Sequence, residues 1–421
     1  MKIAILGGGF TGLTAAYYLI KKNHQVTVFE KEKILGGLAS GFKSENWDWY
    51  LEKTYHHLFA NDYDILNFAK EIEFNKIFFK APETASLYSS PKFNFQIFPL
   101  DTPIDFLKFP YLNIADKLRS GIVIAFLKLS PFLSFYEKQT AEEFLKKTMG
   151  EKVWNILWQQ LFREKYGDYA GKIMASFIWA RIKKRTKNLG YVEGGFQILI
   201  NYLVNLLKEL RVNVLTGYGV ESIKKRGNKF TINNTLYDVV ISTLPTPVLT
   251  KVSQTIFLKN YLDRLSKIKY LHALTLILET NKPILEKTYW LNISVPDISI
   301  MGIVQHTNFM DKKHYGGKHL VYLGWYLKLE DRKWKMGDRE LLNYVKPYLN
   351  KIFNFQFPIS NFYVFRSLYA QPIFDKNFVK NKPDFITPVK NFFIANLDMT
   401  YPYDRGTNYA VKLGKQVAEM I

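Results

Sequence analysis

The sequence contains no cysteine among its 421 residues. This absence excludes disulfide bonds, thiolate metal sites, a cysteine nucleophile and a cofactor attached through cysteine. A chain without cysteine fits a reducing compartment, and we therefore expect a cytoplasmic protein.

Long apolar runs are also missing. The longest candidate, residues 121–135, is interrupted by Lys128 and Pro131. It falls short of the ~20 residues that a membrane-spanning helix needs. We expect this segment to form a buried helix, and the positive charge of the chain leaves shallow docking on the inner face of a membrane as the alternative. The first ten residues, MKIAILGGGF, pass directly into glycines and do not resemble a signal peptide.

Negative charge is scarce, because 37 Asp and Glu face 58 Lys and Arg, which gives a formal net charge of +21. Such a chain attracts anionic partners such as nucleotides, phosphorylated substrates or phospholipid surfaces. Its densest basic tract, RIKKRTK at residues 181–187, is short, and aromatic residues do not alternate with basic ones in a stripe. We therefore predict no nucleic-acid partner and expect a small-molecule substrate. The positive charge would suit an anionic or nucleotide-linked one.

Histidine is rare as well, with 7 in the chain, and two of them are adjacent in EKTYHHLFAND. The composition of this stretch predicts a strand, on which His56 and His57 would point to opposite faces. Two side chains that point apart cannot easily bind one metal ion, and no carboxylate lies nearby at a convincing ligand spacing. We therefore predict no metal site.

The N-terminus supplies the strongest motif. Ile3 to Leu6 is a short apolar run that predicts a buried parallel strand. The GxGxxG turn that follows it comprises Gly7, Gly9, Phe10, Thr11 and Gly12. In such a turn the first glycine permits the tight bend, the second lets backbone approach a pyrophosphate, and the third allows a helix to pack closely. The free N–H groups at the start of that helix would bind phosphate oxygens.

A second strand, VTVFE, ends at Glu30, near the spacing expected of a ribose-binding carboxylate. A carboxylate there would repel a 2′-phosphate, which disfavours NADP. The following residues, KEKILGGLA, add a second glycine pair, Gly36 and Gly37, which a simple NAD dehydrogenase does not need.

With that pair, the run GGGFTGL…VTVFEKEKILGGLAS resembles the N-terminus of the FAD-dependent amine oxidase superfamily. That superfamily includes protoporphyrinogen oxidase, carotenoid desaturases and UDP-galactopyranose mutase. The resemblance implies FAD as the cofactor, with the glycine pair close to the diphosphate and the flavin. Many members carry an arginine beside the pair, whereas this chain has Leu35 and Leu38. Backbone groups and Lys31 or Lys33 would then neutralise the diphosphate.

The same resemblance implies further cofactor contacts. The backbone of Val220 falls at the position that meets the adenine, and Asn396 falls near the ribityl chain. The C-terminal helix would begin at Gly406, Thr407 and Asn408, directed at the flavin pyrimidine ring, where its dipole would stabilise the reduced flavin. Thr407 alternatively serves only as a helix N-cap.

The resemblance also implies an α/β chain with a discontinuous Rossmann-like FAD-binding domain and an inserted substrate domain. The FAD-binding parts are residues 1–75, 186–262 and 385–421. Residues 76–185 are mostly helical and aromatic. Residues 263–384 show period-2 alternation, which predicts an antiparallel sheet.

Catalytic candidates come mainly from the resemblance. His57 and Phe59 match a His-x-Phe segment of UDP-galactopyranose mutase near the flavin, whereas His56 is expected to be structural. VFRSLYAQPIF resembles a turn of protoporphyrinogen oxidase and carotenoid desaturase relatives. There Tyr369 would face the flavin, and Arg366 is either catalytic or a structural ion-pair partner. Arg405 would hold an anionic substrate or a cofactor phosphate, and Gln305 and His306 are further candidates from the sheet.

Three hypotheses follow. The leading one is an FAD-dependent oxidoreductase in which a substrate hydride passes to flavin N5. The second is a sugar mutase resembling UDP-galactopyranose mutase, without net redox change, although the paired substrate-phosphate arginines of that family have no clear match. The third is a flavin-free binding protein of the same fold, as in Rab GDP-dissociation inhibitors. The glycine pair at Gly36 argues against it.

Overall fold

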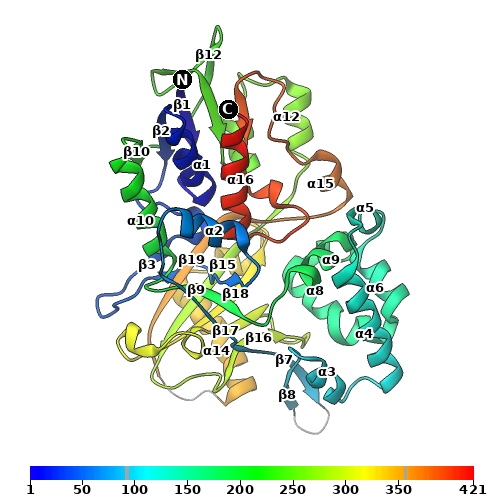
Figure 1. Ribbon diagram of the computed structural model, residues 1–421. Coiled ribbons are helices and arrows are strands. Elements are labelled where there is room, and N and C mark those ends of the chain that lie inside the picture. The colour runs from blue at the N-terminus through cyan, green and yellow to red at the C-terminus, as the bar shows by residue number, and fades with distance from the viewer. Residues whose placement is uncertain (91–93, 355–357) are drawn as a thin grey trace.

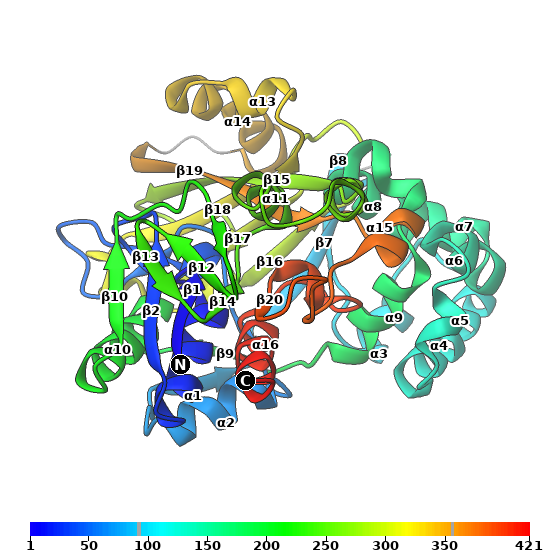
Figure 2. The ribbon, with the colours of Figure 1, turned by 90° about the horizontal axis from the view of Figure 1, so that it is seen from above.

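The computed structural model describes residues 1–90, 94–354 and 358–421. Figures 1 and 2 show three parts: a parallel sheet with its helices, a large mixed sheet, and a helical layer at the opposite edge of the molecule. Among the described residues, no helix combines the length and the apolar character needed to cross a membrane.

The parallel sheet has five strands in the order β10-β2-β1-β14-β20. Its strands are β1 Lys2–Leu6, β2 Gln25–Glu30, β10 Asn213–Thr216, β14 Val239–Ser242 and β20 Phe392–Ile394. Alternate residues of β1 point to opposite faces, as they must on a strand. Ile3 and Ile5 pack toward the helices, whereas Ala4 and Leu6 join the cluster of the small β-meander. The strands come from all three segments that the sequence assigned to the nucleotide-binding part, so the Rossmann-like fold is confirmed.

Helices and a meander cover the two faces of this sheet. The helices of this part are α1 Phe10–Lys21, α2 Tyr63–Glu71, α10 Phe196–Glu209, α11 Thr246–Val252, α12 Lys259–Leu265 and α16 Thr407–Glu419. The meander comprises β11 Lys224–Arg226, β12 Lys229–Ile232 and β13 Thr235–Tyr237. α16 packs on α1 so closely that a Cβ on Gly414 would lie 2.5 Å from the Thr11 carbonyl oxygen. The C-terminal helix is therefore held against the helix that follows the first glycine turn.

The large sheet has the order β19-β15-β18-β17-β16-β7-β8. Its strands are β7 Glu83–Ser90, β8 Asn94–Pro99, β15 Tyr270–Thr280, β16 Thr288–Ile293, β17 Gly302–Gln305, β18 His319–Leu327 and β19 Ile359–Pro372. The sheet differs from the expectation in two respects. β7 and β8 belong to the segment expected to be mostly helical, and β7 pairs with β16 in parallel. Helix α14, Asp338–Phe353, covers one face, where Leu274 and Leu276 lie in its core.

The helical layer has its own aromatic core. Its helices are α3 Pro103–Lys108, α4 Ile114–Leu129, α5 Leu133–Tyr136, α6 Ala141–Met149, α7 Glu151–Val153, α8 Gln159–Tyr166 and α9 Ala175–Lys184. The expectation of a buried helix at residues 121–135 is wrong. Leu127 is fully buried, but Ile122 is 71% exposed and Leu129 is 80% exposed. The apolar run is amphipathic in space, because only one side of α4 meets the layer.

Short elements complete the chain. The short strands are β3 Gly41–Phe42, β4 Leu51–Glu52, β5 Leu58–Phe59, β6 Ile77–Lys80 and β9 Leu189–Val192. The short helices are η1 Gly37–Ala39, α13 Arg332–Lys335 and α15 Lys376–Asn381. Of these, β5, β9 and β6 form a small sheet, in the order given, next to the segment that carries His56 and His57.

Candidate functional site

The first glycine turn connects β1 to α1, and its glycines are required for different reasons. A Cβ on Gly12 would lie 2.0 Å from the Gly7 carbonyl oxygen, so Gly12 is required by the packing of the chain itself. A Cβ on Gly9 would meet nothing closer than the Gly36 oxygen and the Gly37 Cα, both at 4.0 Å. The chain would therefore tolerate a side chain at Gly9, and the missing Cβ leaves room for a group from outside the chain.

The second glycine pair lies directly against the first turn. The Gly36 N–H donates to the Gly8 carbonyl oxygen at 2.9 Å, and Gly9 and Gly36 form a parallel bridge. Gly36 has φ 118° and Gly37 has φ 57°, and L side chains rarely adopt either value. Two glycine turns far apart in sequence thus form one cradle at the N-terminus of α1. A diphosphate fits such a cradle, because backbone N–H groups and a helix dipole meet there without side chains.

Glu30 stands at the end of β2 beside this cradle and is only 9% exposed. Its carboxylate accepts hydrogen bonds from the Gly8 N–H at 2.8 Å and the Glu32 N–H at 2.9 Å. These bonds fix the carboxylate beside the turn, and each oxygen keeps a further lone pair for a ribose hydroxyl. Lys31 is exposed and forms an ion pair with Glu32 at 3.4 Å. Its charge is therefore already partly engaged.

The other expected cofactor residues are placed as follows. Val220 lies in an irregular segment between β10 and β11, not on a strand, and is half-buried against the meander cluster. Leu38 is half-buried against the core of the helical layer. Asn396 is buried, and its amide donates to the Leu244 carbonyl oxygen and the Thr246 hydroxyl, both at 3.0 Å. The Asn396 side chain therefore ties the end of β20 to the turn between β14 and α11, which does not favour a ribityl contact.

The start of α16 is built as an open helix terminus. Gly406 is the N-cap, and no side chain caps this helix, so the alternative interpretation of Thr407 as the N-cap is wrong. The Ala410 N–H donates to the Gly406 carbonyl oxygen at 3.2 Å, which begins the hydrogen bonding of the helix. Asn408 accepts from the Ile65 N–H at 3.1 Å and donates to Asp64 at 3.0 Å. This places α2 beside the terminus, whose first N–H groups have no acceptor within the helix.

The two adjacent histidines lie in an irregular segment before β5, not on the expected strand. His56 Nδ1 lies 2.6 Å from the Thr54 carbonyl oxygen, in keeping with a structural role. The His57 ring packs edge-on against Phe59 and Trp290. Burial lowers the pKa of His56 to about 4 and that of His57 to about 3. Both rings are therefore neutral at physiological pH, and His57 Nδ1 is buried without a hydrogen-bond partner among the described residues.

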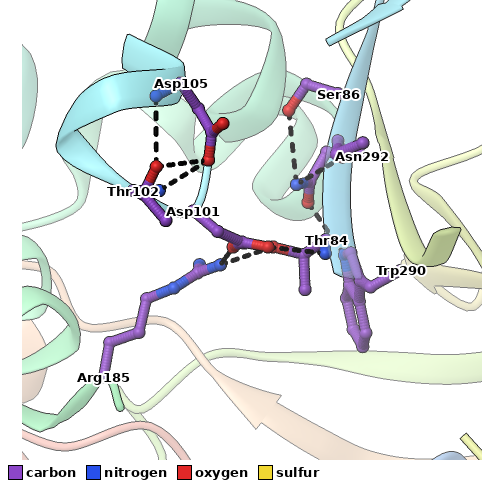
Figure 3. Close-up of polar contacts among 9 residues, drawn as sticks. Thr84, Ser86, Asp101, Thr102, Asp105, Arg185, Trp290 and Asn292 are labelled. Atoms are coloured by element: carbon purple, nitrogen blue, oxygen red, sulfur yellow. Dashed lines mark hydrogen bonds and ion pairs between the residues drawn. The ribbon is translucent and has the colours of Figure 1, made fainter. Parts of the chain in front are cut away.

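The wall beside His57 is braced by a polar network (Figure 3). Asp101 accepts from the Thr84 N–H at 2.6 Å and from Arg185 at 3.0 Å. Trp290 Nε1 donates to the Asn292 side-chain oxygen at 2.9 Å. Asn292 in turn donates to the Ala85 carbonyl oxygen at 3.3 Å and the Ser86 hydroxyl at 3.4 Å, so the tryptophan that faces His57 is tied through Asn292 to β7.

A charged cluster precedes α16, and of its residues the sequence predicted only Arg405. Lys165 lies 2.5 Å from Asp404, and Arg181 lies 3.7 Å from the same carboxylate. Arg405 donates to the Tyr326 hydroxyl at 2.6 Å, while its Nη1 is buried without a partner among the described residues. Burial lowers the pKa of Lys165 to about 8. Three cations thus surround one carboxylate immediately before the helix terminus, which favours binding of an anion.

Two remaining candidates lie on β19. Tyr369 has φ 55° at an irregularity in the pairing of β19 with β15, and its N–H donates to His272 Nδ1 at 2.9 Å. Its ring packs on Tyr270, whose hydroxyl donates to the buried Asp398 at 2.5 Å. Such a rare backbone conformation in a non-glycine residue marks Tyr369 as a position worth testing.

Arg366 lies on the face of the large sheet that α14 covers. It pairs with Asp338 at 2.8 Å and donates to the Met336 carbonyl oxygen at 2.6 Å, both next to α14. Its register partner Leu274 belongs to the core under α14. The structure therefore favours the structural ion pair over the catalytic role.

The two candidates at the end of β17, Gln305 on the strand and His306 directly after it, are likewise bound within the chain. Gln305 accepts from the Ile284 and Leu285 N–H groups, and His306 Nε2 lies 2.8 Å from the Tyr315 hydroxyl. Both side chains are buried. Across the described ranges, no group of three or more His, Asp or Glu is arranged to hold a metal ion.

The family model for flavin-containing amine oxidoreductases matches residues 10–421. The chain therefore belongs to that family, which implies a flavin cofactor, and the resemblance stated from the sequence is confirmed. The structure of putrescine oxidase bound to putrescine has a TM-score of 0.75 at 15% identity, covering 100% of this chain and 98% of that one. Reduced UDP-galactopyranose mutase also has a TM-score of 0.75, at 16% identity, covering 99% and 94%. At these identities the likeness shows the fold alone.

A curated relative shares a shorter segment. The 15-cis-phytoene desaturase of Synechococcus elongatus is 32% identical over 108 residues, which cover 24% of this chain and 22% of the desaturase. The chain therefore aligns with less than a quarter of that relative's length.

Proposed function

We propose that this protein is an FAD-dependent oxidoreductase acting on a small anionic substrate. The observation that carries the proposal is the double glycine cradle, in which Gly36 is hydrogen-bonded to Gly8 and Gly9 leaves room for a group from outside the chain. A single turn would serve any dinucleotide, whereas the second pair favours FAD. When bound, FAD supplies the redox chemistry by accepting a hydride from the substrate.

The residues of the chain would hold and orient the reactants. The α1 terminus and the cradle would bind the diphosphate, and Glu30 would accept from the ribose. The terminus of α16 at Thr407 would place N–H donors and a positive dipole end where negative charge develops during reduction. His57, neutral and close to aromatic side chains, would offer a hydrogen bond and help to exclude water.

The substrate class follows from the charged cluster. Arg405 and Lys165 are fixed by Tyr326 and Asp404, so an anion would meet them already oriented. With Arg181 the cluster carries more positive than negative charge, and it directly precedes α16. A carboxylate, a phosphate or a nucleotide-linked substrate fits this environment.

The test is the absorbance spectrum of the purified protein, with chromatography of the cofactor released on denaturation. We expect flavin bands near stoichiometric occupancy and FAD as the released species. A protein that stays colourless after incubation with FAD would contradict the proposal. Release of FMN or NAD instead would show that the cofactor is not FAD.

Anaerobic reduction followed by exposure to air separates the reaction types. Fast reoxidation is expected of an oxidase. A long-lived reduced form would favour another electron acceptor. It would also call for an assay of the reduced protein with UDP-galactose, in which isomerisation without net redox change would assign the mutase alternative.

A further inference from the structure

An exposed apolar face runs along the outer side of the helical layer. It is formed by Leu118, Ile122, Phe126 and Leu129 of α4 and by Phe132 and Phe135 after it. Their exposed fractions range from 48% at Phe135 to 80% at Leu129. Scattered exposed apolar residues are ordinary, whereas a contiguous set on successive turns of one helix marks an interaction surface. We call this set the α4 face.

The α4 face is not left over from poor packing. Its residues at 118, 122 and 126 are spaced by four, so they lie on one side of the helix. The opposite side provides the packing, because Ser120 and Leu127 are fully buried against the layer. The exposed apolar side of α4 is therefore not needed for packing within the chain and is available to contact a partner.

Cations border the α4 face. Lys128 Nζ donates to the Arg185 carbonyl oxygen at 2.8 Å, and Lys183 Nζ donates to the Ser130 carbonyl oxygen at 2.9 Å. These bonds join the end of α4 to the basic tract at residues 181–187, at the end of α9. The partners in both bonds are neutral carbonyl groups, so neither bond pairs a lysine with a carboxylate.

The carboxylates of α3 and α4 do not neutralise the lysines at the C-terminal end of α4. Asp105 and Asp116 are both held in capping boxes at the N-termini of their helices. Asp116 also pairs with Lys152 at 3.2 Å. In the basic tract, Asp404, Asp62 and Asp101 pair with Arg181, Lys184 and Arg185. The positive charge that flanks the apolar residues at the end of α4 is therefore that of Lys128 and Lys183.

We propose that the α4 face docks on the surface of an anionic phospholipid bilayer. The apolar side chains would enter the boundary between headgroups and acyl chains, and the basic border would meet anionic headgroups. A second copy of the chain is a poorer occupant, because it would bring two strongly positive molecules together. In Figures 1 and 2, α3, α4 and α5 lie at the edge of the molecule opposite β10, so docking there leaves the parallel sheet clear of the membrane.

The test is co-sedimentation of the full-length protein with vesicles of phosphatidylcholine, with and without phosphatidylglycerol. We expect binding to the anionic vesicles that is at least tenfold tighter than to the neutral ones and that weakens with added salt. The double substitution Ile122→Gln/Phe126→Gln should weaken binding by about tenfold for each side chain, from the apolar area no longer withdrawn from water. The substitution Lys128→Gln should weaken binding to anionic vesicles by about fivefold.

Leu258→Gln is the matched control, because Leu258 is 76% exposed but lies before α12, away from the α4 face. It should bind vesicles as the unaltered protein does, and all variants should keep the unaltered circular dichroism spectrum because the positions are exposed. Absence of binding to anionic vesicles at low salt would overturn the proposal, as would equal losses in the control and the double variant. Self-association that the double variant abolishes would assign the face to a second copy instead.

Discussion

The substitution Gly9→Ala separates cofactor binding from stability. Gly9 has φ −81° and ψ 178°, a conformation that alanine adopts readily. The added Cβ would meet no atom of the chain closer than 4.0 Å. Gly9 is the N-cap of α1, where alanine is less favourable than glycine by about 1 kcal/mol or less. The apoprotein should therefore unfold at nearly the same denaturant concentration.

The substitution Gly9→Ala should instead weaken the binding of FAD. A methyl group in the cradle would displace a diphosphate and lengthen one or two hydrogen bonds to a charged group, each worth about 1.5–3 kcal/mol. At about 1.4 kcal/mol per factor of ten, each lost bond weakens binding by about 10- to 100-fold. Fluorescence titration of the apoprotein with FAD measures this affinity, and urea unfolding of the same apoprotein measures stability.

Gly12→Ala is the matched comparison, because it adds the same methyl group one helical turn later. There the Cβ would lie 2.0 Å from the Gly7 carbonyl oxygen, so the turn or the helix must move. We expect a loss of stability of about 1–3 kcal/mol or more in the apoprotein. The reasoning is refuted if Gly9→Ala leaves FAD affinity unchanged, or if it destabilises the apoprotein as much as Gly12→Ala does.

Three further predictions concern charged groups. Arg366→Met should lower the unfolding midpoint, because it removes the bond to Asp338, and should leave FAD affinity within about twofold in the same titration. Burial raises the pKa of Glu52 to about 7, so the folded state holds a proton that the unfolded state loses between pH ~4.5 and ~7, and stability falls as pH rises through that range. Glu52→Gln should abolish this decline, on the order of 3 kcal/mol, in urea unfolding at several pH values, and an unchanged profile would contradict the assignment. Arg405→Gln should weaken sulfate binding, followed through the flavin spectrum, by at least about tenfold, and the unaltered protein should bind sulfate less well as pH rises through about 8, where Lys165 loses its proton. Sulfate binding that is insensitive to both changes would remove the anion site.

The parts of the fold that the sequence predicted are those fixed by local requirements. Gly7 and Gly36 are required by positive φ values, and Glu30 by its place at a strand end, whereas Gly9 leaves room for a group from outside the chain. Arg405 was predicted, but the rest of the charged cluster was missed because Lys165 and Asp404 are 239 positions apart and only the folded chain brings them together. The available signal was the pair Asp404–Arg405 directly before the glycine that caps the last helix.

The incorrect expectations share one cause, since a periodic pattern fixes which residues share a face but not what that face meets. For Arg366 the sequence left a catalytic role and a structural ion pair both open, and only the position of α14, over the face of its register partner Leu274, favours the ion pair. The run at residues 121–135 was apolar enough for a core helix. In the folded chain α9 and the rest of the layer cover only the side of α4 that carries Leu127.

Burial divides the titratable groups near the start of α16 into two kinds. His57 loses its proton to burial and sits among aromatic rings, so it offers a neutral hydrogen bond at any physiological pH. Arg405 stays charged, because the neighbouring tyrosines and Asp404 favour its ionised form despite burial. Burial lowers the pKa of Lys165, and the neighbouring Asp404 raises it in part, so the pKa of Lys165 stands at about 8. In the function we propose, recognition of an anion and its dependence on pH would therefore fall to Arg405 and Lys165, and His57 would contribute to the shape and polarity of the site instead.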